Sequence, residues 1–167
     1  MTELPKTFDP AAIEIRPYFC HAFTAWATGR NFGLVADTST GKTYLAYALA
    51  DEVLASGRRV LFCAPTNVLC EQHAALARLL FRVEPDDVRF VRACQTPKRR
   101  AGAWAGGRIL IATPHTAANA LRQHLLQLED VGLVIIDEGH HEARTHASIA
   151  VASAAHAQGI RILALTA

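Results

Sequence analysis

The sequence predicts an α/β fold, in which an open, mostly parallel β-sheet carries helices on both faces. Short apolar runs alternate with longer helical segments along most of the 167 residues. Most of these runs are apolar throughout, which is typical of strands that are buried on both faces. Several runs end in Thr, Asp or Gly-Lys-Thr, and polar groups at the carboxyl ends of parallel strands are where ligands bind in such folds.

The expected elements follow from periodicity and from turn residues. Residues 1–12 contain two prolines and no periodicity, so we expect a loose lead-in before a helix over 13–29 that ends at Gly29. Strands are expected at 32–36, 60–64, 88–93, 108–112, 133–136 and 160–165. Helices are expected from the Gly-Lys-Thr turn to about 56, and over 68–82, 97–106, 114–127 and 148–158. Thr96-Pro97 and Thr113-Pro114 are typical helix starts.

Composition favours one soluble domain. Hydrophobic residues make up 51% of the chain and the formal net charge is only +2, which by itself does not argue for a nucleic-acid partner. The four cysteines show no metal-ligand spacing, and neither a signal peptide nor a membrane-spanning run is visible. We therefore expect an intracellular protein, cytoplasmic or in the nucleoid or nucleus, with no membrane partner.

The turn before the second helix has the pattern of a phosphate-binding loop. It follows a strand and precedes an Ala-rich helix, so backbone N–H groups and the positive helix end would face one anion. Lys42 would reach the β- and γ-phosphates, and the Thr43 hydroxyl would bind Mg²⁺. The expected nucleotide-binding residues are Ala36, Asp37, Thr38, Ser39, Thr40, Gly41, Lys42 and Thr43.

Two carboxylates follow the most apolar run. Asp137 comes directly after residues 133–136, where a strand would end at the ligand-binding edge, and it is the expected second partner of Mg²⁺. Glu138 beside it is the expected base that polarises the attacking water. The alternative is a surface turn with two solvated acids.

Five ordered motifs resemble those of the first RecA-like domain of a superfamily 2 helicase of the DExH type. They spread over nearly the whole chain, at 36–43 (motif I), 64–69 with Gln72 (motif Ia), 112–116 (motif Ib), 137–140 (motif II) and 165–167 (start of motif III). Within the superfamily, residues 13–18, 64–81 and 97–104 look most like the Hef and FANCM group. The resemblance implies a RecA-like P-loop NTPase domain over 13–167 that stops inside motif III, with ATP and Mg²⁺ as cofactors.

The resemblance also implies further site residues. Arg16 would belong to the nucleotide site, and His140 and Thr166 would couple it to nucleic acid and to a second RecA-like domain, in cis or trans. Thr66, Thr113 and Pro114 would contact the DNA or RNA backbone without sequence specificity. Both threonines can instead be N-caps of the helices that follow, and the two roles are compatible. For His140 the alternative is a loop histidine without a role.

Other residues invite functional interpretations that we weigh against ordinary structural ones. The run Lys98-Arg99-Arg100 could touch nucleic acid, but a solvated helix face is the favoured interpretation. Histidines 140, 141 and 146 lack the H-E-x-x-H spacing of a zinc site. Trp26 and Trp104 are expected in the core rather than stacked on bases.

The favoured hypothesis is the ATP-binding domain of a DNA or RNA helicase or translocase. The main alternative is a non-hydrolysing module that binds nucleic acid or protein. Two departures from the family pattern favour it, Ser39 where a glycine is usual and Phe19 where an adenine-reading glutamine is expected. A third possibility is a P-loop ATPase that acts on something else. Without the second domain and its arginine finger, we expect weak nucleotide binding and slow or no hydrolysis.

Overall fold

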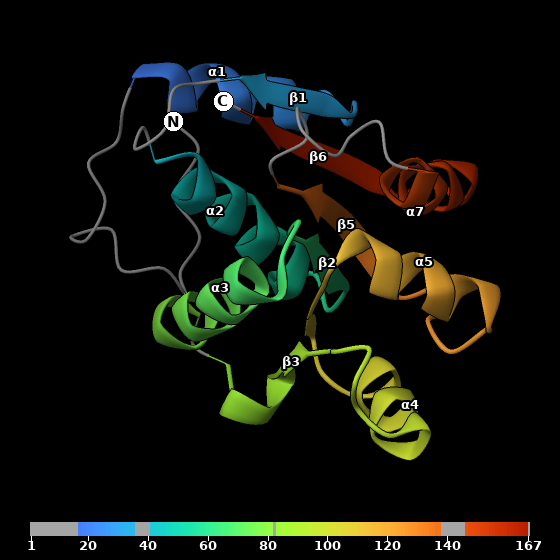
Figure 1. Cartoon of the computed structure of the whole chain (residues 1–167). Coiled ribbons are helices and arrows are strands. Elements are labelled where there is room, and N and C mark those ends of the chain that lie inside the picture. Colours follow the sequence, from blue (N-terminus) through green and yellow to red (C-terminus); the bar gives the residue numbers. More distant parts are fainter. Residues whose placement is uncertain (1–16, 36–40, 82, 138–145, 167) are drawn as a thin grey trace.

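The computed structural model describes residues 17–35, 41–81, 83–137 and 146–166 (Figure 1). The strands in these ranges are β1 (Phe32–Val35), β2 (Arg59–Cys63), β3 (Val88–Phe90), β4 (Ile109–Ala112), β5 (Val131–Ile136) and β6 (Arg161–Thr166). The helices are α1 (Pro17–Ala27), α2 (Lys42–Ala55), α3 (Asn67–Leu80), the short 3₁₀ turn η2 (Pro85–Asp87), α4 (Pro97–Ala105), α5 (Pro114–Arg122) and α7 (His146–Ala157).

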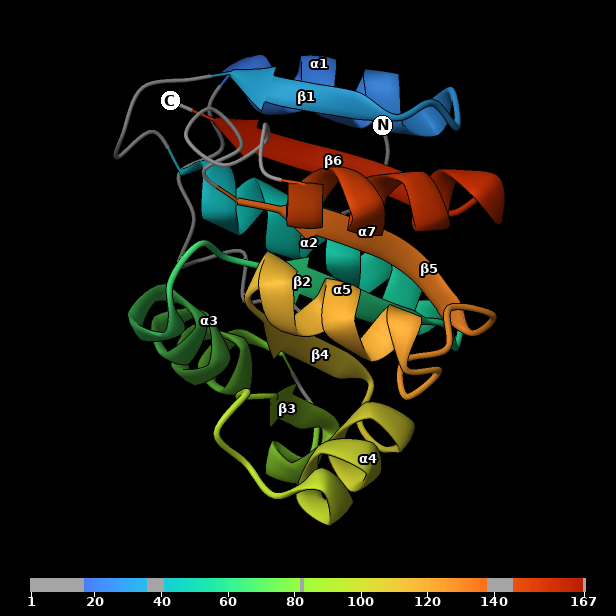
Figure 2. The same ribbon diagram turned by 45° about the vertical axis from the view of Figure 1, so that its right-hand side comes forward.

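The strands form one six-stranded sheet in the order β1-β6-β5-β2-β4-β3 (Figure 2). Every pair of neighbouring strands is parallel. The expected open sheet is therefore confirmed, and it is parallel throughout the described chain. All carboxyl ends of the strands consequently lie along the same edge.

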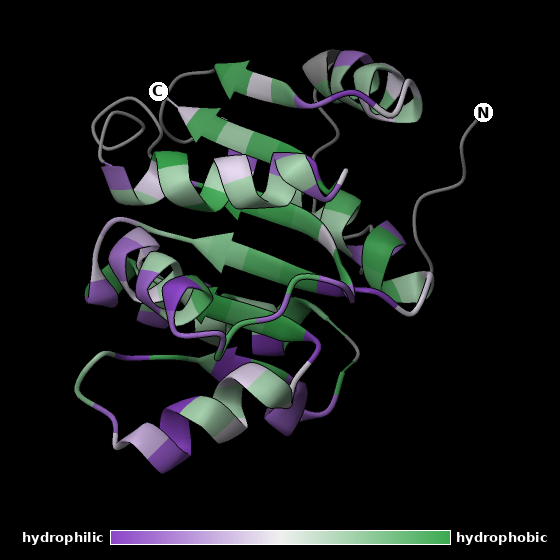
Figure 3. Cartoon of the chain, turned by 90° about the vertical axis from the view of Figure 1, so that its right-hand side faces the viewer, coloured by the Kyte–Doolittle hydropathy of each residue, from purple (hydrophilic) through white to green (hydrophobic). Residues whose placement is uncertain are grey.

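Helices cover both faces, as Figures 1 and 2 show. Side chains of α1, α2 and α3 pack with Phe62, Ile135 and Leu163 in one buried cluster. Side chains of α4, α5 and α7 pack with Leu61 and Val134 in a second cluster. Because successive strand residues point to opposite faces, each central strand contributes to both clusters. Hydrophobic residues accordingly gather in the strands, and hydrophilic ones on the outer helix surfaces (Figure 3).

The apolar runs at β2, β4 and β5 are buried almost completely, as predicted. The run at β1 differs. It was expected to be a buried strand, but β1 lies at the sheet edge, pairs only with β6, and alternates between half-buried and exposed residues. An apolar run of four residues fits both positions, and only the strand order distinguishes them.

Two elements are shorter than expected. Strand β3 ends at Phe90 rather than 93, because the Arg92 backbone N–H turns to the Gln95 side chain (3.1 Å) instead of a neighbouring strand. Helix α5 ends at Arg122 rather than about 127, because His124 adopts a left-handed conformation (φ 55°). The chain then turns and buries Leu126 and Leu128 in the core.

All four cysteines are free thiols. Cys63 and Cys70 are buried, and burial raises the pKa of the Cys70 thiol to about 11, so it stays protonated near neutral pH. In the described part of the chain, no helix combines the length and the apolar character that a bilayer span requires.

Candidate nucleotide-binding site

The register of the sheet brings several predicted site residues to one edge. Cys63, the last residue of β2, pairs with Ile136 of β5 on one side and with Ala112 of β4 on the other. Asp137 and Thr113 directly follow these partners, and Thr66 follows Cys63 by three residues. Thr166 ends β6 and pairs with Val35, the last residue of β1. This edge is where ligands bind in open parallel sheets.

Helix α2 begins at this edge with the Gly-Lys-Thr sequence. Gly41 is its N-cap and has a φ of 89°, a left-handed conformation that glycine adopts without steric cost. Lys42 and Thr43 form the start of a 14-residue helix, where the helix dipole and the direction of the backbone N–H groups favour an anion. The local geometry therefore suits phosphate binding.

Asp137 extends β5 by one residue. Its backbone N–H donates to the carbonyl of Cys63 (2.8 Å), so the position of the residue is set by the central strand pair. Its side chain is only 15% exposed. A carboxylate that is held at the ends of two buried, paired strands has little freedom to relocate.

Hydrogen bonds join Asp137 to two residues that were not predicted as site residues. His73 contacts the carboxylate directly, and Tyr47 is linked to it through His73. Nε2 of His73, on α3, lies 2.9 Å from Oδ2 of Asp137. Nδ1 of the same ring lies 3.0 Å from the hydroxyl of Tyr47, on α2. His73 could have been noticed as a polar residue on the inward-facing, helical spacing of Leu69, Leu76 and Leu80, but the sequence does not show what it contacts.

The Tyr47 hydroxyl lies in an apolar setting. Its side chain is 1% exposed, and burial, followed by the negative charge of Asp137, raises the pKa of Tyr47. The phenol therefore remains protonated at all physiological pH values and acts as a hydrogen-bond donor. It donates to the His73 carbonyl (3.1 Å) and lies 3.0 Å from Nδ1 of His73.

Both predicted backbone-contact threonines are N-caps. Oγ1 of Thr66 accepts from the N–H of Leu69 (3.2 Å), and Oγ1 of Thr113 accepts from the N–H of Thr116 (3.3 Å). Pro114 is the first residue of α5, where its missing N–H costs nothing. The capping alternative is therefore confirmed, and it leaves room for contacts to a bound strand as well, since Thr66 is exposed.

The other predicted site residues fall outside the described ranges. These are Arg16, Ala36, Asp37, Thr38, Ser39, Thr40, Glu138 and His140. Their roles stay predictions, as does the effect of Ser39 on the loop.

The aromatic residues near the N-terminus are mainly structural. Phe19 is 4% exposed and Trp26 is 3% exposed, and both belong to the cluster under α1 and α2. Trp104 is 1% exposed in the other cluster. The expected core placement of both tryptophans is confirmed, and Phe19 has no face available for stacking on a base.

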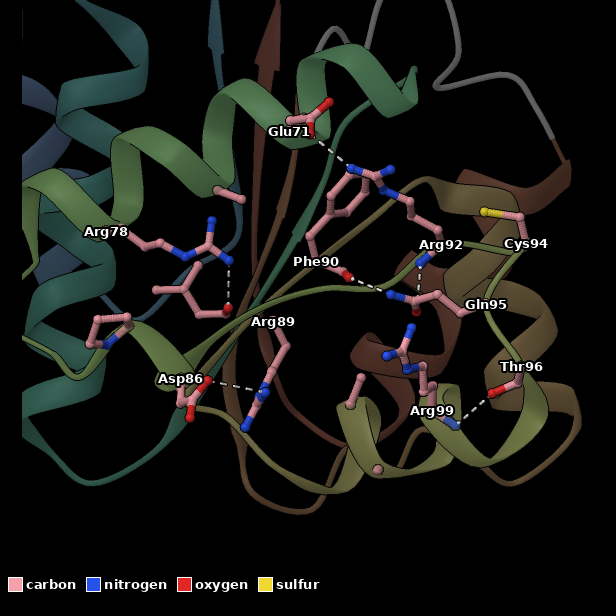
Figure 4. Close-up of a pocket in the computed structure, with 15 residues that line it drawn as sticks. Glu71, Arg78, Asp86, Arg89, Phe90, Arg92, Cys94, Gln95, Thr96 and Arg99 are labelled. Carbon is pink, nitrogen blue, oxygen red and sulfur yellow. Dashed lines mark hydrogen bonds and ion pairs between the residues drawn. The ribbon is translucent and has the colours of Figure 1, made fainter.

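A basic groove of about 970 Å³ lies between α3, β3 and α4 (Figure 4). Its wall carries four arginines, Arg78, Arg89, Arg92 and Arg99, against only two carboxylates, Glu71 and Asp86. The Arg92 guanidinium lies over the Phe90 ring at 4.5 Å and pairs with Glu71 at 2.9 Å. Lys98 and Arg99 are exposed, as expected for a solvated helix face, and Arg99 also lines this groove.

One part of the groove lining, at Arg92, lies at the ligand-binding edge. The Val91 N–H donates to the carbonyl of Ile111 (2.8 Å), so the chain from Arg92 onward leaves the sheet beside the end of β4. Arg92 thus lies at the same edge as Thr113, and its partner Glu71 lies in the second turn of the helix that Thr66 caps.

The donor set at the edge fits Mg²⁺ rather than zinc. Thr43 and Asp137 offer a hydroxyl and a carboxylate, and Mg²⁺ takes oxygen ligands together with substrate phosphates. Among the described residues, His146 included, no three His, Cys, Asp or Glu side chains group in a way that could hold a metal ion by themselves.

An all-parallel sheet, a Gly-Lys-Thr helix start and an aspartate at the same edge define the class of P-loop NTPase domains. The family model for DEAD/DEAH box helicases matches residues 16–167, and the chain belongs to this family.

Similar proteins agree with this assignment. The Hef helicase domain of Pyrococcus furiosus, known from a crystal structure, has a TM-score of 0.83 and 31% identity, and the match covers 96% of this chain and 34% of that one. A Methanocaldococcus jannaschii protein, provisionally named an ATP-dependent RNA helicase, is 30% identical over 144 residues, which are 86% of this chain and 18% of the relative.

The ATP-dependent DNA helicase mph1 of Sclerotinia sclerotiorum is 26% identical over 141 residues, covering 82% of this chain and 11% of that protein. The predicted resemblance to superfamily 2 helicases, and to the Hef and FANCM group among them, is confirmed. The chain spans less than a fifth of each of these two curated relatives.

Proposed function

We propose that this chain is the ATP-binding domain of a superfamily 2 DNA or RNA helicase or translocase, which couples ATP hydrolysis to remodelling of nucleic acid. The observation that carries the proposal is the connection between the start of α2 and the end of β5. Tyr47, one helical turn after Thr43, is linked through His73 to Asp137. The expected phosphate-binding helix and the expected metal-binding aspartate are thus held in one hydrogen-bonded unit.

Each residue has a role in this proposal. Lys42 and the N–H groups of residues 36–43 hold the triphosphate, and Thr43 and Asp137 hold Mg²⁺, which neutralises charge on the phosphates. Glu138 orients and deprotonates the attacking water. Arg16 contributes at the nucleoside end. The buried Phe19 offers no hydrogen bond to adenine, so we expect weak discrimination among the four nucleoside triphosphates.

Nucleic acid would run along the carboxyl edge of β2, β4 and β3. Thr66, Thr113 and Pro114 provide hydroxyls and helix N-termini for phosphates, and such contacts carry no sequence information. Arg92 and Arg99 continue the same edge with positive charge. A second RecA-like domain, in cis or trans, would close over the nucleotide. His140 and Thr166 would couple the nucleotide site to that domain and to the nucleic acid.

The test is ATP hydrolysis by the chain together with a second RecA-like domain, measured with and without single-stranded DNA or RNA. We expect the strand to stimulate turnover, and strand affinity to fall as salt rises. Salt-dependent strand binding with no nucleotide binding would replace this proposal by the non-hydrolysing module. ATP turnover that neither DNA nor RNA stimulates would favour an ATPase that acts on something else.

The capping threonine Thr66 separates support of the helix from contact with a strand. Asp and Asn are both good N-caps, so Thr66→Asp and Thr66→Asn should each keep the free energy of unfolding within about 0.5 kcal/mol. Only Thr66→Asp places a negative charge against the phosphates. We expect it alone to weaken strand binding, measured by fluorescence anisotropy, with the difference shrinking at high salt. Equal affinities for the two variants would remove Thr66 from the interface.

Arg92 tests the extension into the basic groove. Arg92→Ala should weaken strand binding and lower the slope of log affinity against log salt by about 1, as loss of one phosphate contact does. Arg122→Ala is the matched control, because Arg122 ends α5 at the opposite edge of the sheet. An identical salt slope for wild type and Arg92→Ala would show that the strand does not reach the groove.

A further inference from the structure

A buried hydrogen-bonded chain joins three elements behind the nucleotide-binding edge. It runs from the Tyr47 hydroxyl on α2, through the His73 imidazole on α3, to the Asp137 carboxylate after β5. Tyr47 and His73 are 1% and 7% exposed. An ionised carboxylate only accepts hydrogen bonds, so Nε2 of His73 carries the proton and donates to Asp137. Nδ1 of the same ring lies 3.0 Å from the Tyr47 hydroxyl, which also donates to the His73 carbonyl.

Aromatic neighbours hold the imidazole in this orientation. The Phe62 ring of β2 lies 4.2 Å from the His73 ring, centroid to centroid, and the Tyr47 ring meets it edge-on at 87° and 6.2 Å. The Phe81 ring packs against the Tyr47 ring at 5.3 Å, centroid to centroid. The position of the His73 proton donor is therefore fixed by packing as well as by hydrogen bonds.

We propose that His73, supported by Tyr47, is a positioning residue that orients the Asp137 carboxylate for Mg²⁺ and keeps it in register with Thr43. This inference rests on the proposed function, in which Asp137 and Thr43 hold the metal. His73 occupies Oδ2 from the interior side, which sets the rotation of the carboxylate plane. A hydrogen bond of this kind to a metal-binding side chain tunes metal affinity, and its loss typically costs 10–100-fold.

Tyr47 adds the link to the other metal-binding side chain. Residues four apart lie on the same face of a helix, so Thr43 and Tyr47 share a face of α2. The chain Tyr47–His73–Asp137 thus spans from the helix that carries Thr43 to the strand that carries the carboxylate. The distance between the two metal ligands is then set by side chains inside the domain, before any nucleotide binds.

The test compares three variants by their affinity for a fluorescent ATP analogue, in Mg²⁺ and in EDTA. His73→Leu introduces an apolar side chain of similar size and removes the N–H that donates to Asp137. His73→Gln offers an amide N–H near the place of Nε2. Tyr47→Phe removes only the hydroxyl and keeps the ring contacts. His156→Leu, at an exposed position near the end of α7, is the matched control.

We expect Mg²⁺ to tighten binding to the wild type, and His73→Leu to reduce this gain about 10–100-fold with little change in EDTA. His73→Gln should recover part of the gain, Tyr47→Phe should lose less than His73→Leu, and His156→Leu should match the wild type. A purely structural role would instead lower affinity equally in Mg²⁺ and EDTA, in step with the melting temperature.

The outcomes separate this inference from the proposed function. A wild type that binds no nucleotide, or gains nothing from Mg²⁺, contradicts the proposed function itself. A wild type with a clear Mg²⁺ gain that His73→Leu retains contradicts only the positioning role. If His73→Leu fails to fold, Tyr47→Phe decides: an unchanged Mg²⁺ gain in a folded Tyr47→Phe, with His73→Gln also unchanged, overturns the inference.

Discussion

Replacement of Glu138 by glutamine is expected to lower ATP turnover about 10²–10⁴-fold, because general bases contribute on this scale to hydrolytic reactions. The amide cannot accept the proton of the attacking water, although its size and its hydrogen-bonding reach are nearly those of the carboxylate. Nucleotide affinity should therefore change little. The measurement is steady-state ATP hydrolysis with nucleic acid and the second RecA-like domain present, next to equilibrium binding of a nucleotide analogue.

Glu129→Gln is the matched control for this prediction. Glu129 is exposed and lies two residues before β5 in the sequence, whereas Glu138 follows the last residue of β5 by two positions, so the same substitution is made on either side of this strand in the chain. Lys42→Ala completes the set, since it should weaken nucleotide binding together with turnover. Full turnover in Glu138→Gln, or an equal loss in Glu129→Gln, would remove Glu138 from the role of base.

Leu133→Ala is expected to destabilise the domain by about 2–5 kcal/mol, the usual range for emptying a buried leucine site. Leu133 is fully buried in β5, the strand that carries Asp137, and contributes to the cluster under α1, α2 and α3. For a chain of this size each kcal/mol lowers the melting temperature by about 2–4 °C. Urea denaturation followed by circular dichroism measures the effect.

The same substitution at Leu79 serves as the comparison. Leu79 is 80% exposed on α3, so Leu79→Ala should stay within about 0.5 kcal/mol of the wild type. Similar losses at both positions would mean that β5 is not the buried centre of the sheet.

The likeness to helicases was readable from the sequence because its motifs are local. Gly41, Lys42 and Thr43 are consecutive, and each expected backbone-contact threonine directly precedes a helix start. Local hydrogen bonds set such caps and turns, so the order of residue types was sufficient to predict them. The fully apolar runs at β2 and β5 predicted central parallel strands for the same reason.

Strand order, by contrast, depends on contacts between distant segments. The edge position of β1 follows from which strand neighbours it, and no local pattern encodes that choice. The groove between α3, β3 and α4 likewise exists only once three segments have packed together.

The amino-acid sequence alone determined the family, the parallel α/β architecture and which residues are candidates for binding phosphate and metal, since these depend on short-range spacing and periodicity. Tertiary structure alone decided that Tyr47 and His73 form a hydrogen-bonded chain to Asp137. These three residues lie 26 and 64 positions apart in the chain, and packing of α2 and α3 on the same face of the sheet brings their polar atoms within 3.0 Å. A buried polar atom must find a hydrogen-bond partner, but which partner it finds depends on the fold as a whole.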